Sequence, residues 1–167
     1  MNVALFGFMG VGKSVVGRML AERLDLSFVD LDEEVVRRTG RSIEQIFKED
    51  GEERFREMEK ALVREYSARD GQVVACGGGT VLDPENKENL RRSSTMVLLT
   101  AEPEVILERV ESEEDVRPLL NVEDRKGKIR GLLSERWPSY LKAADIIVDT
   151  SEYPPHEVVS IIIENLE

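Results

Sequence analysis

Residues 7–14 read GFMGVGKS and lie between the apolar run of residues 3–6 and a helical pattern that begins at Lys13. This is the complete GxxxxGK[ST] phosphate-loop pattern in a strand–loop–helix context, which makes a chance glycine-rich turn a poor alternative. The glycines let the backbone curl so that successive N–H groups face phosphate oxygens. Lys13 can then bridge the β- and γ-phosphates, and the Ser14 hydroxyl can ligate Mg²⁺. The stretch predicts that the chain binds a nucleoside triphosphate with magnesium.

Two aspartates, Asp30 and Asp32, stand two residues apart at the end of the second apolar run. In extended backbone their side chains would lie on one face, at the edge where open α/β sheets bind ligands. One carboxylate near Mg²⁺ and another accepting a hydrogen bond from an alcohol would serve phosphoryl transfer to a hydroxyl group. The alternative is that Asp32 caps a helix beginning near Glu33. The phosphate loop on the neighbouring strand favours the functional interpretation.

A glycine triplet and two arginines are further candidates. The triplet at residues 77–79 directly follows the third apolar run, which is typical of a chain that approaches a ligand closely, although a flexible turn is the alternative. Arg56 lies at the margin of an apolar helical stripe, and Arg136 lies just before Pro138. Each arginine taken alone is typical of a solvated surface. Because the chain has a net charge of −11, an anionic substrate would need such a local arginine cluster.

Short apolar runs separated by helical patterns predict a parallel α/β sheet. The predicted strands are Val3–Phe6, Ser27–Asp30, Val73–Cys76, Met96–Leu99 and Ile146–Val148. Amphipathic helices are predicted over Lys13–Leu24 and Glu52–Ala68. About forty helical residues separate the second and third strands, whereas a crossover needs about a dozen. The excess predicts an inserted substrate-binding subdomain.

Local signals mark some helix boundaries. Ser42 and Gln45 form a capping-box pattern that starts a helix, and Gly51 is expected to end it. Pro138 is expected to break or kink a helix near Trp137. These signals place short helices inside the inserted segment and a discontinuity near the C-terminal strand.

Residues 111–115 read ESEED, and after Val116 an RPLL sequence begins at Arg117. A run so polar and so crowded with like charge is not expected to pack well. Because Arg117 follows, we interpret the segment as a mobile flap, with an ordinary solvated loop as the alternative.

Composition excludes several classes of function. The chain of 167 residues fits one domain, and its excess of 34 acidic over 23 basic residues argues against a nucleic-acid or anionic-membrane surface. A single cysteine, Cys76, and a single histidine, His156, exclude a disulfide framework and a multidentate Cys/His metal site. The start of the chain leads straight into the first strand without a leader pattern, so we expect a cytoplasmic protein.

The motifs together resemble the shikimate kinase family over nearly the whole chain. In order, the matching segments are GFMGVGKS, FVDLD, TGRSIEQIFKEDGEERFREME, GGG, RPLL and RWPSYLKAADIIVDT. The resemblance implies an α/β fold of nucleoside-monophosphate-kinase type, with a five-stranded parallel sheet in the order 2-3-1-4-5 flanked by helices. It implies one domain over residues 1–167, with a substrate-binding subdomain at about 32–60 and a lid at about 110–124.

The resemblance also assigns roles to residues of this chain. ATP contacts are implied for Gly10, Val11, Gly12, Lys13, Ser14, Val15, Arg109, Arg117 and Tyr153. Magnesium would be held by Ser14 and, through water, by Asp30. Shikimate contacts are implied for Asp32, Arg56, Gly77, Gly78, Gly79 and Arg136. The implied catalytic residues are Lys13, Asp32 and Arg117.

Two departures from relatives affect the adenine end of the site. Some relatives have two adjacent basic residues where this chain has Arg109 followed by Val110. Some have an arginine where this chain has Tyr153, and a tyrosine could stack on adenine instead.

The resemblance implies a monomeric, cytoplasmic kinase that uses ATP and Mg²⁺ to phosphorylate the 3-hydroxyl of shikimate in chorismate and aromatic amino acid synthesis. No nucleic-acid or membrane partner is expected. The alternatives are a kinase of the same fold acting on another polyol acid such as gluconate, a non-catalytic nucleotide-binding regulator, and a P-loop switch. The regulator is disfavoured because the chain keeps Lys13, Ser14, Asp30, Asp32 and Arg117, and no sensing loops of a switch are identified.

Overall fold

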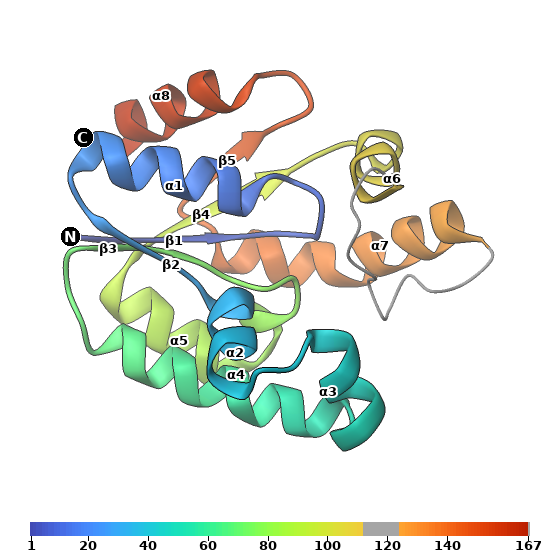
Figure 1. Ribbon diagram of the computed structural model, residues 1–167. Coiled ribbons are helices and arrows are strands. Elements are labelled where there is room, and N and C mark those ends of the chain that lie inside the picture. Colours follow the sequence, from blue (N-terminus) through green and yellow to red (C-terminus); the bar gives the residue numbers. More distant parts are fainter. Residues whose placement is uncertain (112–123, 167) are drawn as a thin grey trace.

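The computed structural model describes residues 1–111 and 124–166, and it contains a five-stranded parallel sheet (Figure 1). The strands are β1 Asn2–Phe6, β2 Ser27–Asp30, β3 Gln72–Ala75, β4 Thr95–Thr100 and β5 Ile146–Asp149. Their order is β2-β3-β1-β4-β5, with every neighbouring pair parallel. The predicted strands and their order are confirmed, apart from shifts of one residue at some ends.

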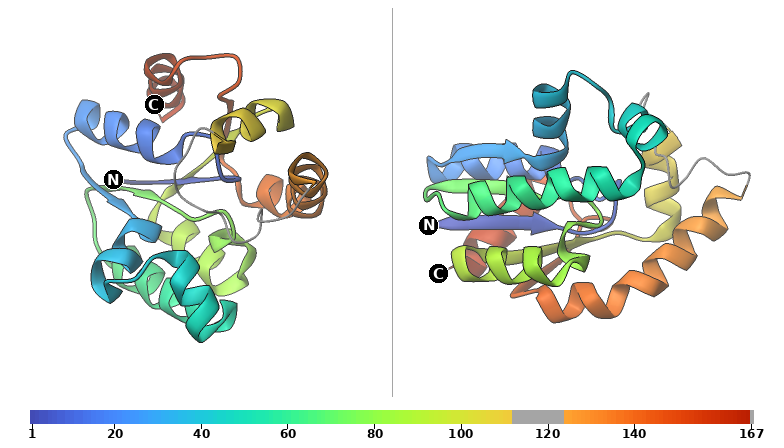
Figure 2. Two further views of the ribbon diagram at one scale, coloured as in Figure 1. Left: turned by 45° about the vertical axis from the view of Figure 1, so that its right-hand side comes forward. Right: turned by 90° about the horizontal axis from the view of Figure 1, so that it is seen from below.

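The central strands are buried because helices cover both faces of the sheet. Every residue of β1 and β3 is buried, which explains their continuous apolar runs. Helices α1 and α8 lie on one face, and α4, α5 and α7 lie on the other (Figures 1 and 2). The edge strands β2 and β5 are only partly covered. Their carboxyl ends, together with those of the central strands, form the edge at which ligands of such sheets bind.

The helices follow from the amphipathic patterns and from local caps. Their bounds are α1 Lys13–Leu24, α2 Leu31–Thr39, α3 Ile43–Asp50, α4 Glu52–Ser67, α5 Pro84–Ser93, α6 Pro103–Glu111, α7 Arg125–Ala143 and α8 Pro155–Leu166. A 3₁₀ turn, η1, covers Thr80–Leu82. The capping box of Ser42 and Gln45 is formed, and Gly51 ends α3 with φ +86°. The helices α2, α3 and α4 therefore fill the long crossover between β2 and β3. In the described part of the chain, no helix is long and apolar enough to cross a membrane.

Of the break or kink predicted at Pro138, the break is wrong, because α7 continues through it from Arg125 to Ala143. A proline removes one backbone donor, and buried contacts on both sides can hold a helix together across that loss. Ile129 before the proline and Tyr140 after it are buried. The helix curves along its length, as Figure 2 shows in its right-hand view. Continuity matters for the site, because Arg136 and Tyr140 remain one helical turn apart on a single helix.

The turn after β1 requires a glycine at residue 7. Gly7 has φ +141°, and a Cβ at this position would lie 2.3 Å from the carbonyl oxygen of Leu99 in β4. Both the backbone angle and the contact with a fixed backbone atom exclude a side chain. The start of the phosphate loop is therefore set by close packing between β1 and β4.

We predict opposite effects of the same substitution at two glycines. Gly7→Ala should lower the free energy of unfolding by about 2 to 4 kcal/mol, since it adds backbone strain and a clash. Gly131→Ala is the matched control, because Gly131 lies in α7 with open space around it. It should raise stability by about 0.5 to 1 kcal/mol through helix propensity. Urea unfolding followed by circular dichroism measures both, and an unchanged unfolding midpoint in Gly7→Ala would contradict the packing constraint.

Candidate active site

The phosphate loop joins β1 to α1 at the carboxyl edge of the sheet (Figure 1). Gly7, Gly10 and Gly12 all have positive φ, and Gly12 is the N-cap residue of α1. The Lys13 ammonium donates hydrogen bonds to the carbonyl oxygens of Gly7, at 2.6 Å, and Phe8, at 3.1 Å. These bonds hold the ammonium group over the loop. The helix N-terminus and the curled backbone make this a site for phosphate oxygens.

Asp30 and Ser14 meet beside the phosphate loop. The Ser14 hydroxyl donates a hydrogen bond to one Asp30 carboxylate oxygen, and the other oxygen accepts from the Glu33 N–H at 3.1 Å. Asp30 is thus the N-cap of α2, so the alternative that Asp32 caps this helix is wrong. The helix begins at Leu31, so Asp30 is the last residue of the strand and Asp32 lies in the helix. The two aspartates therefore do not share one face of an extended strand, contrary to the prediction from the sequence.

The donor set at this point suits magnesium. A hydroxyl and a carboxylate are hard oxygen ligands, and Mg²⁺ bound to nucleotide phosphates commonly takes only one or two ligands from the protein. No group of three or more His, Cys, Asp or Glu side chains that could hold a metal by itself occurs among the described residues. Ser14 and Asp30 therefore fit a metal that arrives with phosphate oxygens.

The glycine segment, residues 77–79, is bordered by charged side chains from two helices. A Cβ on Gly77 would lie 2.8 Å from an Asp32 carboxylate oxygen, and one on Gly79 would lie 2.7 Å from two Arg56 nitrogens. Close approach of these side chains therefore requires glycine. Asp32 comes from the first turn of α2 and Arg56 from the first turns of α4. The structure thus brings both residues to the segment that follows β3.

Glu59 fixes the position of Arg56, although sequence reasoning did not identify it. One Glu59 carboxylate oxygen accepts from Arg56 Nη1 at 3.0 Å, and the other accepts from the Thr80 hydroxyl at 2.8 Å. Glu59 is 2% exposed. A signal was available, because Glu59 lies three residues after Arg56 and falls within the apolar stripe of α4. A buried carboxylate at such a position needs a cationic partner.

Arg136 is buried on the other side of the glycine segment. Its guanidinium lies 5.4 Å from the centre of the Phe8 ring, and the residue is 7% exposed. Its Nη1 has no hydrogen-bond partner within the described part of the chain. A Cβ on Gly78 would lie 3.1 Å from that nitrogen and 3.7 Å from the Met9 N–H nitrogen. An unpaired buried guanidinium nitrogen beside the phosphate loop is suited to an anionic group of a ligand.

Arg109 is attached to the phosphate loop rather than extended into open space. Its Nη1 donates to the Gly10 carbonyl and to the Thr150 hydroxyl, both at 3.0 Å, and its Nη2 donates to the Thr150 carbonyl at 3.0 Å. Thr150 in turn bonds to the carbonyl of Thr100 at the end of β4. The guanidinium therefore links α6, the phosphate loop and the segment after β5.

The remaining predicted residues lie as follows. Val15 is exposed in the first turn of α1, and Tyr153 is 38% exposed between β5 and α8. Arg117, with the flap at 112–115 and most of the lid, lies outside the described residues. Cys76 is buried, which raises the pKa of its thiol and keeps it protonated.

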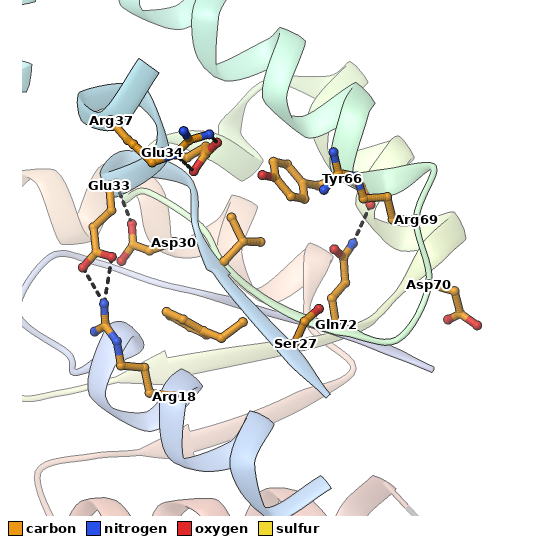
Figure 3. Close-up of a pocket in the computed structure, with 12 residues that line it drawn as sticks. Arg18, Ser27, Asp30, Glu33, Glu34, Arg37, Tyr66, Arg69, Asp70 and Gln72 are labelled. Atoms are coloured by element: carbon orange, nitrogen blue, oxygen red, sulfur yellow. Dashed lines mark hydrogen bonds and ion pairs between the residues drawn. The ribbon is translucent and has the colours of Figure 1, made fainter. Parts of the chain in front are cut away.

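A hollow of about 620 Å³ beside the edge strand β2 differs in its charged groups from the candidate site at the carboxyl edge of the sheet (Figure 3). Four of its charged side chains form two pairs: Arg18 with Glu33 at 2.8 Å, and Glu34 with Arg37. The Arg37 hydrogen bond lowers the pKa of the Glu34 carboxyl to about 2. Paired charges beside an edge strand discourage pairing with another chain. The unpaired cationic nitrogen of Arg136 lies instead at the carboxyl edge of the sheet.

The sheet order, the phosphate loop and the inserted helices define a P-loop kinase of nucleoside-monophosphate-kinase type. The family model described as shikimate kinase matches residues 9–167. The chain belongs to the shikimate kinase family. This result confirms the family to which the sequence motifs pointed.

Individual relatives agree with this assignment. The shikimate kinase of Thermus thermophilus is 50% identical over 164 residues, which cover 98% of this chain and 89% of that protein. A solved shikimate kinase from Acinetobacter baumannii in complex with shikimate has a TM-score of 0.94 and 36% identity, covering 99% of this chain and 92% of that one. A gluconokinase from Sinorhizobium meliloti reaches a TM-score of 0.57 at 16% identity, with coverages of 99% and 90%. That last similarity concerns the fold alone.

Proposed function

We propose that the protein transfers the γ-phosphoryl group of ATP to the 3-hydroxyl of shikimate, giving shikimate 3-phosphate and ADP in chorismate and aromatic amino acid synthesis. Membership of the shikimate kinase family supports the reaction type. The observation that carries the choice of acceptor is the buried Arg136 guanidinium, whose unpaired Nη1 faces the glycine segment beside a complete phosphate loop. That arrangement suits an alcohol that also carries a carboxylate.

In this proposal the phosphate loop holds ATP. The backbone around Gly10, Val11 and Gly12 and the first turn of α1, including Val15, surround the phosphates. Lys13 exchanges its bonds to loop carbonyls for phosphate oxygens, which places its charge where negative charge develops. Ser14 and Asp30 hold magnesium, Asp30 through water. Magnesium, when bound, neutralises phosphate charge.

The acceptor lies between the glycine segment and the helices that border it. Arg56 and Arg136 hold the carboxylate, since two planar guanidinium groups can bind it through paired hydrogen bonds. Asp32 orients the ring hydroxyls and accepts the proton of the attacking 3-hydroxyl. Gly77, Gly78 and Gly79 allow the ring to approach the backbone. Because catalysis is positioning and charge stabilisation, no covalent enzyme intermediate is required.

Further parts of the proposal concern regions around the nucleotide. Arg117 closes over the phosphates from a lid at about residues 110–124, and residues 32–60 form the substrate-binding subdomain. Arg109 and Tyr153 border the adenine, with Arg109 acting from its bonds to Gly10 and Thr150. All proposed contacts come from one chain, which supports a monomer. ATP use supports a cytoplasmic setting.

The proposal predicts acceptor-dependent ADP release. Mg-ATP is incubated with shikimate, with gluconate and without an acceptor, and the product is detected by mass spectrometry. We expect ADP release with shikimate alone, a product one phosphoryl group heavier, and loss of the reaction when EDTA removes magnesium. Release with gluconate alone would transfer the function to a gluconate kinase. Nucleotide binding without turnover on either acceptor would indicate a regulator.

Asp32→Asn should lower kcat by a factor of about 100 or more, since the amide cannot accept the hydroxyl proton as a carboxylate does. The KM for ATP should change by no more than about twofold, because Asp32 lies at the acceptor side. Asp70→Asn is the matched control, since Asp70 pairs with the N-terminal ammonium at 2.7 Å, outside the proposed site. Steady-state kinetics with shikimate and ATP varied separately measures both variants. Full turnover in Asp32→Asn would exclude Asp32 from the chemistry.

A further inference from the structure

Tyr140 is a buried residue of α7 that no role proposed above uses. It is 1% exposed and lies one helical turn after Arg136, on the same face of the helix. Its ring packs edge-on against Phe6 of β1, with ring centres 5.9 Å apart. Its hydroxyl donates a hydrogen bond of 2.5 Å to the carbonyl oxygen of Gly78. Phenylalanine could supply the packing, whereas the bond to the Gly78 carbonyl and the interaction of the hydroxyl with Arg136 require a tyrosine.

The hydrogen bond sets the direction of the peptide between Gly78 and Gly79. In a trans peptide the carbonyl and the N–H point in opposite directions. Because the Gly78 carbonyl faces Tyr140, the Gly79 N–H points away from α7. The N–H groups of Gly78 and Gly79 are not among the paired backbone donors of the described chain. Glycine peptides reorient at low cost, so the segment needs an external contact to keep this direction.

The direction of the Gly78–Gly79 peptide affects whether Arg136 can bind an anion. Its unpaired Nη1 would lie 3.1 Å from a Cβ placed on Gly78, so the Gly78 carbonyl is a nearby alternative acceptor. A buried N–H without a partner is costly and takes an acceptor that can reach it. If the carbonyl were released from Tyr140, it could rotate toward Nη1. The guanidinium would then be occupied by the protein's own backbone.

We propose that Tyr140 is a positioning residue for the acceptor: its hydroxyl holds the Gly78 carbonyl away from Arg136 and thereby leaves Arg136 Nη1 and the Gly79 N–H available to the ligand. Burial raises the pKa of this hydroxyl, so it remains a donor at neutral pH. This role rests on the proposed shikimate kinase activity, because it concerns the same acceptor site.

The test is Tyr140→Phe, which removes one oxygen atom and keeps the ring. Tyr66→Phe is the matched control, since Tyr66 is a buried tyrosine of α4 that lines the hollow beside β2, with Arg38 and Arg69 at 6.0 Å and 4.4 Å from its ring centre. In Tyr140→Phe we expect the KM for shikimate to rise about tenfold while the KM for ATP stays within about twofold. Tyr66→Phe should leave both constants unchanged. An unchanged KM for shikimate in Tyr140→Phe, or equal rises for both substrates, would overturn the proposal.

Amide NMR gives a readout that does not depend on turnover. In the ligand-free proteins the Gly78 and Gly79 amide resonances should shift in Tyr140→Phe and not in Tyr66→Phe; unshifted resonances would overturn the proposed peptide direction. If the parent protein releases no ADP with shikimate, the proposed function fails, but these spectra still test the hydrogen bond. If Tyr140→Phe does not fold, shikimate is added to the parent protein. The Gly79 amide must then shift and the Gly131 amide must not, and an unmoved Gly79 resonance would overturn the proposal.

Discussion

A buried guanidinium with an unpaired nitrogen is the interaction on which the organisation of the acceptor site depends. Removing an arginine from water costs several kcal/mol unless partners replace the water. At Arg136 the Phe8 ring, 5.4 Å away, supplies part of the compensation, while Nη1 has no partner in the described residues. The remaining stabilisation can come from an anionic ligand. The Arg136 guanidinium is thus buried and already oriented before an acceptor binds.

Sheet topology explains why this group lies beside the phosphate loop. Because β3 pairs with β1, the glycine segment that follows β3 emerges next to the loop that follows β1. The absence of Cβ atoms at Gly77 and Gly79 then admits Asp32 and Arg56 from the inserted helices. The proposed nucleotide and acceptor sites are therefore adjacent for topological reasons. Local arginines also explain how a chain with a net charge of −11 can bind two anionic substrates.

The parts of the molecule that depend on local pattern were predictable from the sequence. The phosphate loop, the parallel strands and the Ser42 capping box follow from short-range rules, whereas the strand order was implied by the resemblance to the shikimate kinase family. Contacts between distant segments were not predictable in this way. Arg109 bonds to Thr150, 41 residues away, and the Thr80 hydroxyl donates a hydrogen bond to Glu59, 21 residues away. Asp30, and not Asp32, caps α2 because the helix begins at Leu31, earlier than the pattern suggested.

The most direct test of the arginine clamp compares shikimate with its methyl ester as phosphoryl acceptors, in the parent protein and in Arg136→Ala. The methyl ester has no carboxylate charge and cannot form the charge-assisted hydrogen bonds to the buried Arg136 guanidinium. The parent protein should therefore use the ester with a kcat/KM about 100-fold lower than that for shikimate. In Arg136→Ala the acid should lose most of its advantage, and the two acceptors should differ by no more than about tenfold. Equal use of acid and ester by the parent protein would contradict the carboxylate clamp.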